Sequence, residues 1–256
     1  MRQTYGVPGV PRLLRVLVPL LAVLWSCGSS SPEGPGEDDL AILFIGNSLT
    51  YWNDMPDILE RLLEDADIGP VYVDMQAFAN WGLTDHWEDI RTRNLIESGG
   101  WDVVALQQGP SATEGRPSLL QYSALFAAEI EAAGARTALY MVWPAEDRSF
   151  DFDGVSDSYR TAAEQVDGLL YPAGEAWRAA WVRDPTLELY GPDRFHPSLL
   201  GSYLVALVIY EQLSGKDPRE LPPEIPIPGG KVVLSQSVAD AVQSAAVEAN
   251  AQFARP

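Results

Sequence analysis

A serine, a histidine and an aspartate have the types and spacing needed for nucleophilic catalysis. Ser48 follows closely on the apolar run of residues 40–45. A serine hydroxyl is a weak nucleophile at neutral pH and needs a base, which a histidine can supply. His196 stands three residues after Asp193, so one turn of the chain can bring the carboxylate to the imidazole and fix its tautomer. These residues predict a site in which Ser48 is the attacking group.

Each of these side chains also has a purely structural interpretation. Asn47 and Ser48 could form a turn and cap the next helix, because strand-to-helix turns commonly use such residues. His196 precedes Pro197, which suits the first position of a helix, so this histidine could be a loop residue that caps that helix. A lone histidine such as His86 is weak evidence for a site, so we expect it to pack or to cap a helix.

A regular alternation of strands and helices must position these groups. Apolar or alternating runs predict strands at residues 40–45, 71–78, 101–106, 137–143 and 168–172. Helical spacing of apolar residues predicts helices at residues 55–66, 84–97, 117–133, 159–166, 174–182, 197–213 and 235–253. Residues 145–153 are expected to form a surface loop, and the proline-rich residues 221–230 an extended connector. The pattern is typical of a three-layer α/β/α domain with a parallel sheet.

Three polar breaks containing glycine follow strands of this predicted sheet. They are Gly46-Asn47-Ser48, Asn80-Trp81-Gly82 and Gln107-Gln108-Gly109. Because the connections are short, the carboxyl ends of the strands should share one edge of the sheet. The three breaks would then line one crevice, where open α/β sheets place their chemistry.

The first 26 residues have the features of an export signal. Three arginines precede the first acidic residue, and residues 16–25 are apolar apart from Pro19. That run is too short to span a bilayer comfortably, but it has the length of a signal core. The stretch that ends in Cys27 is similar to the lipobox of bacterial lipoproteins, in which the cysteine is lipidated. We therefore predict an exported protein anchored in the cell envelope through Cys27; plain secretion and an uncleaved anchor are the alternatives.

The predicted organisation has three parts. Residues 1–26 are the signal peptide, residues 27–39 a flexible tether rich in Ser, Gly, Pro and acids, and residues 40–256 a single domain. On this prediction the protein meets a membrane only through the lipid anchor.

Composition excludes several classes of partner. The net charge is -19 and the isoelectric point about 4.3, which argues against nucleic-acid binding because few groups could neutralise phosphates. A single cysteine forms no internal disulfide, and two histidines without ligand spacing give no zinc signature. We expect no metal and no cofactor, and the sequence carries no indication of oligomeric state.

The chain resembles the GDSL, or SGNH, hydrolases over about residues 40–213. Three stretches carry the resemblance: Gly46-Asn47-Ser48-Leu49, the glycine break after the second strand, and Asp193-x-x-His196. The resemblance implies a flavodoxin-like three-layer fold in which Ser48 is the nucleophile, His196 the general base and acid, and Asp193 its orienting partner. It also implies that the backbone N–H groups of Ser48 and Gly82 stabilise the oxyanion, a contribution that is usually large in acyl transfer.

Two positions depart from the pattern of that family. Asn47 replaces the usual aspartate before the serine, which leaves the mechanism intact because Asp193 is the acid of the triad. The family's third block supplies an oxyanion asparagine, whereas the corresponding strand end here reads Gln107-Gln108-Gly109. A glutamine amide has the same donor chemistry, so we predict Gln108 as the third donor, with Gln107 as the alternative. These departures indicate a divergent branch.

Residues beside the strand ends suggest how a substrate is held. Trp52, Trp81 and Trp143 could form an aromatic platform for a sugar or acyl chain, or could cap the core. Asn47 and Gln107 are the further candidates for substrate contact. The resulting prediction is an exported serine esterase acting on a small-molecule or carbohydrate ester, with acetyl groups preferred. The alternatives are a lipase-like or thioesterase-like acyl hydrolase, and a non-catalytic surface carbohydrate-binding protein on the same fold.

Overall fold

The computed structural model describes residues 34–254 of the 256-residue chain. The predicted signal peptide and Cys27 lie outside the described residues, so their roles stay predictions. The described end of the predicted tether, residues 34–39, is exposed or half-exposed and contains a turn in which the Gly36 N–H donates to Asp39 Oδ2 at 2.8 Å. Within residues 34–254, no helix is both long enough and apolar enough to cross a bilayer.

Five parallel strands form the centre of the fold. They are β1 Leu40–Gly46, β2 Val71–Ala77, β3 Val103–Leu106, β4 Arg136–Tyr140 and β5 Leu169–Tyr171, in the order β2-β1-β3-β4-β5. In register, Ile42 lies opposite both Val73 of β2 and Val103 of β3. All residues of β1 after Leu40 are buried, as expected of a strand with a helical layer on each face. The predicted parallel sheet is confirmed.

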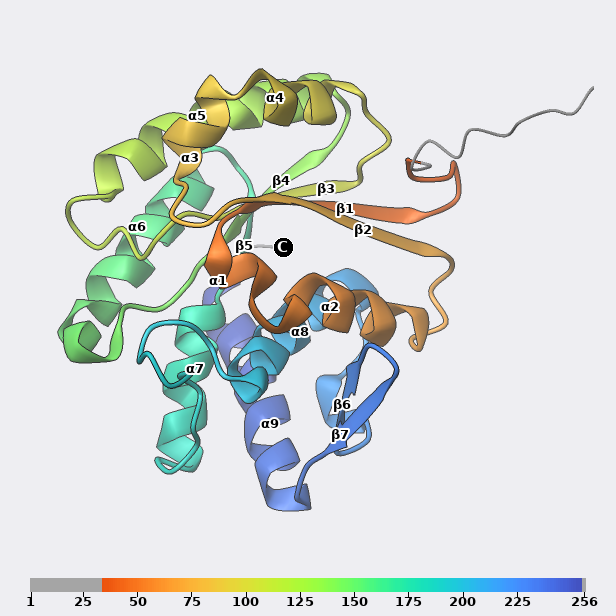
Figure 1. Cartoon of the computed structure of the whole chain (residues 1–256), viewed down its shortest axis with the longest axis vertical. Coiled ribbons are helices and arrows are strands. Elements are labelled where there is room, and N and C mark those ends of the chain that lie inside the picture. Colours follow the sequence, from red (N-terminus) through yellow and green to blue (C-terminus); the bar gives the residue numbers. More distant parts are fainter. Residues whose placement is uncertain (1–33, 255–256) are drawn as a thin grey trace, which may run out of the picture. The chain divides into compact units, whose positions relative to one another are not determined.

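Helices cover both faces of the sheet (Figure 1). Helices α3 Leu83–Glu88, α4 Ile90–Glu97, α5 Arg116–Ala132 and α6 Phe152–Gln165 lie on one side. Helices α2 Met55–Glu64, α7 Ala173–Arg183, α8 Leu199–Ser214 and α9 Gln236–Phe253 lie on the other. The four-residue helix α1 Ser48–Tyr51 and the 3-10 turn η1 Trp52–Asp54 connect β1 to α2. The three-layer α/β/α architecture is thus confirmed.

The site-forming edge of the sheet follows from this topology. The connection from β1 to β2 passes through α2 on one face, and the connection from β2 to β3 passes through α3 and α4 on the other (Figure 1). The connection after β3 passes through α5 on the same face as α3 and α4, so the neighbouring strands β1 and β3 are followed by helices on opposite faces, which makes a switch point between them. Ligands of open α/β sheets bind outside the carboxyl ends of the strands at such a switch point.

Three segments differ from the predicted elements. The helix predicted over residues 84–97 is two helices, because Asp89 has an extended backbone and its carboxylate accepts from Arg91 N at 3.1 Å, which caps a new helix. The loop predicted at residues 145–153 contains the 3-10 helix η2 Glu146–Asp151, after which α6 begins earlier than predicted.

The predicted connector at residues 221–230 is also more ordered than expected. After the short η3 Pro218–Glu220, β6 Glu224–Ile227 and β7 Gly230–Val233 form an antiparallel hairpin outside the main sheet. Pro226 is tolerated because both strands of a two-stranded sheet are edges. Gly229, with φ of +77°, makes the turn.

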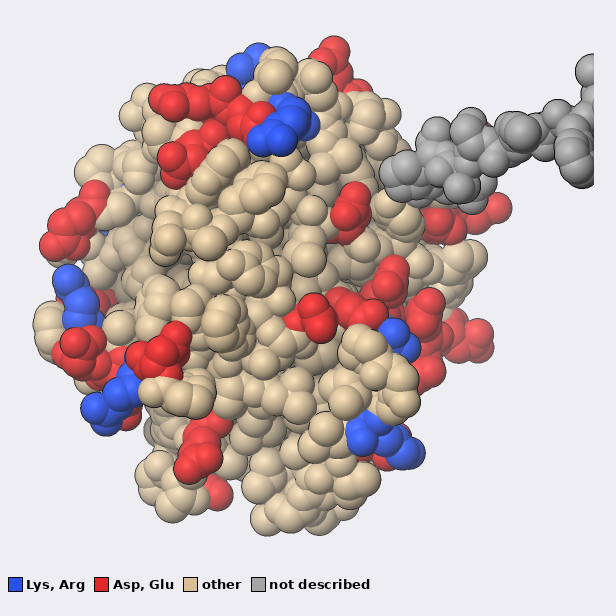
Figure 2. All heavy atoms as spheres, in the orientation of Figure 1, with Lys and Arg blue, Asp and Glu red and all other residues tan. Residues whose placement is uncertain are grey.

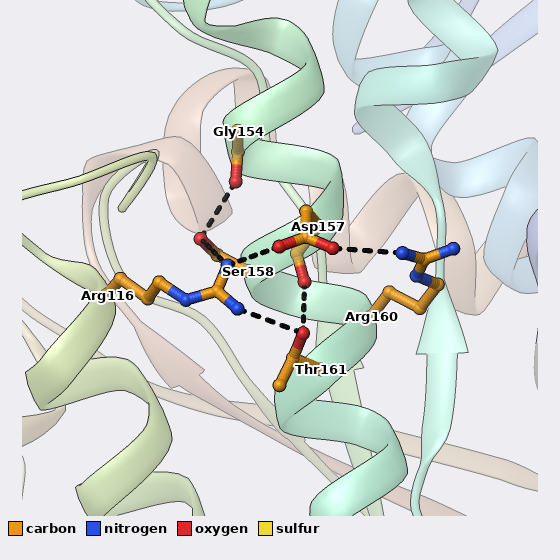
Figure 3. A network of polar contacts seen from close by, with 6 residues as sticks. All are labelled: Arg116, Gly154, Asp157, Ser158, Arg160 and Thr161. Carbon is orange, nitrogen blue, oxygen red and sulfur yellow. Dashed lines mark hydrogen bonds and ion pairs between the residues drawn. The ribbon is translucent and has the colours of Figure 1, made fainter.

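A polar network braces α5 against α6 (Figure 3). Arg116 at the start of α5 donates to Asp157 Oδ2 at 2.7 Å and to Thr161 Oγ1 at 3.2 Å. Arg160 donates to the other oxygen of Asp157 at 2.9 Å. On the same helix as Asp157, the buried Tyr159 hydroxyl donates to the carbonyl of Gln108 at 2.6 Å. The brace therefore fixes α6 beside the polar break that follows β3.

Candidate active site

Asn47 shapes the corner where β1 turns into α1. Its Oδ1 accepts from Leu49 N at 3.0 Å, which caps α1, and its Nδ2 donates to the carbonyl of Trp81 at 2.9 Å. Both ends of this buried amide are therefore occupied, and the capping interpretation of Asn47 holds. These bonds use Oδ1 and one of the two Nδ2 hydrogens, and contact of Asn47 with a substrate stays a prediction. Ser48, the first residue of α1, is positioned by this cap and is 8% exposed.

Gly46 is required by close packing at the same corner. A Cβ atom at this position would overlap Thr50 Oγ1 and would come within 2.5 Å of Gln107 Oε1. Contacts this short do not occur for real side chains, so any residue larger than glycine would displace the corner. The glycine before Asn47 is thus explained by space.

The structure brings the three predicted catalytic side chains into one hydrogen-bonded chain. His196 Nε2 lies 2.8 Å from Ser48 Oγ, and His196 Nδ1 lies 2.5 Å from Asp193 Oδ2. With these partners the neutral imidazole carries its proton on Nδ1, which donates to the aspartate. Nε2 is then free to accept from the serine hydroxyl. The arrangement has the geometry of a nucleophile, a base and an orienting acid.

Asp193 is itself fixed by the backbone of its own loop. Its Oδ1 accepts from the N–H groups of Phe195 at 3.1 Å and His196 at 3.0 Å. The hydrogen bond from the His196 ring, assisted by these two N–H groups, holds the pKa of the Asp193 carboxyl below its ordinary value. The carboxylate is therefore ionised at neutral pH, as an orienting acid requires.

The loop that carries Asp193 and His196 is pinned at several points. Gly191 N donates to the carbonyl of His196 at 2.7 Å. Arg194, with φ of +62°, forms an ion pair with Glu146 of η2. Trp143 Nε1 donates to the carbonyl of Phe195 at 3.1 Å. These contacts hold the imidazole in place, the first from within the loop and the other two from outside it.

The segment after Ser48 covers the imidazole. Trp52 stacks on His196 with ring centroids 4.0 Å apart and an interplanar angle of 18°. Asn53, with φ of +55°, donates from Nδ2 to the carbonyl of Pro197 and to Ser202 Oγ, each at 3.0 Å. The segment after Ser48 and the start of α8 are thereby joined directly. Trp52 remains 38% exposed, so of the predicted tryptophans it is well placed to meet a substrate.

The two predicted backbone oxyanion donors have different surroundings. The N–H of Ser48, in the first turn of α1, donates to no acceptor among residues 34–254. The N–H of Gly82, at the start of α3, donates to Asp85 Oδ2 at 2.8 Å. Asp85 must therefore release Gly82 before that donor can serve an oxyanion.

Gln107 is a structural partner of the corner that holds Ser48. It is fully buried, and its Oε1 accepts from Asn47 N at 2.9 Å and from Thr50 Oγ1 at 2.8 Å. Its Nε2 donates to the carbonyl of Gln108 at 2.5 Å. The side chain thus holds the residues on both sides of Ser48 and presents no amide to a substrate or an oxyanion, contrary to both predictions for Gln107.

Gln108 is likewise occupied by the protein itself. Its Nε2 donates to Ser111 Oγ at 2.7 Å and to the carbonyl of Gly115 at 2.9 Å, while its Oε1 accepts from Leu83 N at 3.3 Å. Donor and acceptor partners on opposite ends leave one orientation for the amide. The prediction of Gln108 as third oxyanion donor therefore has no support in this geometry, because its hydrogens face the loop before α5.

The other two predicted tryptophans have different surroundings. Trp143 is fully buried and stacks on Trp177 at 3.8 Å, so it is not a substrate platform. Trp81 is half-buried and packs against Phe78 and His86. The capping interpretation applies to Trp143, and Trp81 lines the same corner.

His86 has a structural place, as expected. Its ring is fully buried, with Nε2 2.8 Å from the carbonyl of Gly46 and Nδ1 3.3 Å from Thr92 Oγ1. Burial lowers the pKa of this imidazole below its ordinary value. No feature of the sequence indicates that His86 supports the β1 corner, since Gly46 lies 40 residues away.

Comparisons with known proteins identify the fold. No family model matches the chain, and no curated protein matches it. The chain is similar in structure to a proposed SGNH hydrolase from Slackia heliotrinireducens, at 26% identity over 69% of this chain and 100% of that chain, with a TM-score of 0.59.

Two further structures extend the likeness. A DUF4886 family protein from Bacteroides uniformis covers 84% of this chain and 96% of its own at 18% identity, with a TM-score of 0.69. A mutant of an acetyl-xylooligosaccharide esterase from Geobacillus Stearmophilus covers 72% of this chain and 96% of its own at 17% identity, with a TM-score of 0.52. At such identities these two show a shared fold, and the predicted SGNH-type fold is confirmed.

Proposed function

We propose that this chain, which its structural neighbours support as a divergent SGNH/GDSL hydrolase, is a serine esterase that cleaves short acyl esters. The observation that carries the proposal is the unbroken hydrogen-bonded chain from Asp193 through His196 to Ser48. The loop that carries Asp193 and His196 meets Ser48, which lies 148 residues before the histidine, in the order that acyl transfer needs.

The geometry supports a two-step reaction. Ser48 Oγ attacks the ester carbonyl as its proton passes to His196 Nε2, and Asp193 stabilises the imidazolium that forms. The carbonyl oxygen becomes an oxyanion, which the N–H of Ser48, and that of Gly82 once Asp85 has moved, can stabilise. The alcohol leaves with the proton from Nε2. Water, activated by the same imidazole, then hydrolyses the acyl-serine.

Acetyl esters of carbohydrates are the preferred substrate in this proposal. Trp52, exposed beside the imidazole, offers a ring surface to the alcohol half of an ester. A structural neighbour of the same fold is by name an acetyl-xylooligosaccharide esterase. Export and lipidation at Cys27 belong to the same proposal and rest on the sequence of residues 1–27. Radiolabelled palmitate incorporated by the wild type but not by Cys27→Ser is the result expected for a lipoprotein.

The proposal is tested by hydrolysis of p-nitrophenyl acetate. We expect turnover by the wild type and its loss in Ser48→Ala and in His196→Ala, with unchanged circular dichroism. Equal residual rates in all three proteins would show that these residues do not catalyse the reaction.

A second candidate is a lipase-like acyl hydrolase. A lipase/acylhydrolase from Enterococcus faecalis has the same fold, at 15% identity and a TM-score of 0.57. Esters of increasing chain length separate the two candidates, because faster cleavage of octanoate than of acetate supports the lipase.

A further inference from the structure

A groove of about 1050 Å³ lies beside the Ser48–His196 pair. Trp52, whose ring stacks on His196, forms part of its wall. The rest of the wall comes from η1, from η2, and from the end of α7 together with the segment between α7 and α8. Ser48 and His196 are not part of this lining. Trp52 therefore stands between the groove and the imidazole of His196.

The chemistry of ester cleavage assigns this side of the site to the alcohol half of the substrate. When the tetrahedral intermediate collapses, the C–O bond to the alcohol breaks and the alcohol oxygen takes the proton from His196 Nε2. The leaving oxygen must therefore lie next to the imidazole. Trp52 stacks on the face of that imidazole and also lines the groove. An alcohol longer than one ring would therefore extend past Trp52 into the groove.

The lining of the groove has the composition of a site for a neutral polyol. Trp52, Trp181 and Tyr190 contribute ring surfaces, and other lining positions carry short polar or acidic groups: Asn53, Ser149, Thr186 and Glu188. Aromatic rings with a few polar groups are the usual pattern of a small-molecule site. The tryptophan and tyrosine are held by their polar tips, because Trp181 Nε1 donates to the carbonyl of Leu187 and the Tyr190 hydroxyl to that of Pro144.

Charge disfavours an anionic alcohol in this groove. Among the described residues that line it, Arg194 is the basic one, and it is paired with Glu146. The chain as a whole carries a net charge of -19, and acidic side chains are spread over the face seen in Figure 2. Phosphorylated or uronic-acid groups would meet repulsion here.

We propose that this groove is the subsite for the alcohol half of the substrate and that it binds a neutral oligosaccharide of more than one sugar ring. Its volume is at the upper end of that of sites for drug-sized ligands, which leaves room for several rings. The inference rests on the proposed esterase function for its orientation, but binding in the groove can be measured without turnover.

The first test compares two substrates in kinetic assays. Trp181→Ala removes a ring from the groove, Ser149→Arg obstructs it from an exposed position, and Val182→Ala changes the adjacent, 82% exposed residue outside the lining. We expect Trp181→Ala and Ser149→Arg to raise KM for mono-acetylated xylotetraose about tenfold. The KM of both variants for p-nitrophenyl acetate should stay within about twofold of the wild-type value. Val182→Ala should leave KM unchanged for both substrates. Parallel changes for both substrates would overturn the proposal. Ser149→Arg keeps the test valid if Trp181→Ala does not fold.

The second test measures binding to Ser48→Ala by calorimetry. The probes are mono-acetylated xylo-, cello- and chito-oligosaccharides, and we expect saturable binding of at least one of them, weakened by Ser149→Arg. Absence of binding for all three at millimolar concentration would overturn the groove proposal even if p-nitrophenyl acetate is hydrolysed. Conversely, binding without any hydrolysis would support the groove and overturn the esterase.

Discussion

The carboxylate of Asp85 lies 2.8 Å from the backbone nitrogen of Gly82, the N–H group that the proposed mechanism assigns to the oxyanion. This contact closes the capping box of α3, so it stabilises the helix. In the proposed mechanism, it also places a negative charge where negative charge develops during the reaction. Helix capping and the proposed catalysis would therefore compete for the same donor, the N–H of Gly82.

Asp85→Ala should separate these two effects. We expect the free energy of unfolding to fall by about 1 kcal/mol, as for other lost caps, and kcat for p-nitrophenyl acetate to rise about threefold because Gly82 is released. Asp89→Ala is the matched control, since Asp89 caps α4 through Arg91 N. It should lower stability to a similar extent and leave kcat unchanged. A fall in kcat for Asp85→Ala would show that the carboxylate assists the reaction.

Gln107→Leu should damage catalysis through the nucleophile corner. The change leaves Asn47 N–H and Thr50 Oγ1–H without their buried acceptor, which should lower the free energy of unfolding by about 2 kcal/mol or more. Because Ser48 lies between those two donors, we expect kcat to fall about tenfold or more with KM changed much less.

Thr50→Val is the matched variant for Gln107→Leu. It removes one of the two contacts with Gln107 and preserves shape, so its effect on kcat should be smaller. If Gln107→Leu and Thr50→Val differ in stability but both keep the wild-type kcat, Gln107 supports only the fold. Thermal unfolding and steady-state kinetics on the same preparations decide this.

Gly46→Ala should test the close packing at the end of β1. The new methyl group would overlap Thr50 Oγ1 and approach Gln107 Oε1 to 2.5 Å, so we expect a loss of about 1–3 kcal/mol in the free energy of unfolding and a reduced kcat. Gly109→Ala, where an added Cβ meets nothing within 4 Å, is the control and should be near neutral. Similar urea midpoints for the two variants would contradict the packing argument.

His86 should make the protein less stable as the solution is acidified. Burial lowers the pKa of its imidazole in the folded protein, so the unfolded chain binds more protons once the pH falls toward the ordinary histidine value of about 6.5 and below. Stability is then fully present above that pH and decreases below it. His86→Gln keeps an amide donor for the Gly46 carbonyl but cannot titrate. Its unfolding free energy, measured by urea titration from neutral to mildly acidic pH, should fall less steeply; parallel curves would refute the assignment.

Local patterns were sufficient for the strands and for most of the helices. The run Leu40–Gly46 has no polar side chain, which suits a strand buried between two layers, and the β/α alternation then implied the fold. The break at Asp89 was missed because a cap there depends on one side-chain rotamer, which periodicity does not contain. The hairpin of β6 and β7 was missed because its prolines, unfavourable within a sheet, are tolerated on edge strands.

The sequence by itself determined the class of fold and pointed to Ser48, Asp193 and His196 as the proposed reacting side chains, because apolar periodicity and residue chemistry are local properties. Only the tertiary structure decided which polar groups are available. Gln108 has an amide suited to an oxyanion, yet its partners, Leu83 N and the Gly115 carbonyl, come from two other segments. These hydrogen bonds join atoms that lie far apart in the sequence, so they form only when the distant segments pack together. The sequence pattern around a side chain therefore does not show whether its polar atoms are already hydrogen-bonded.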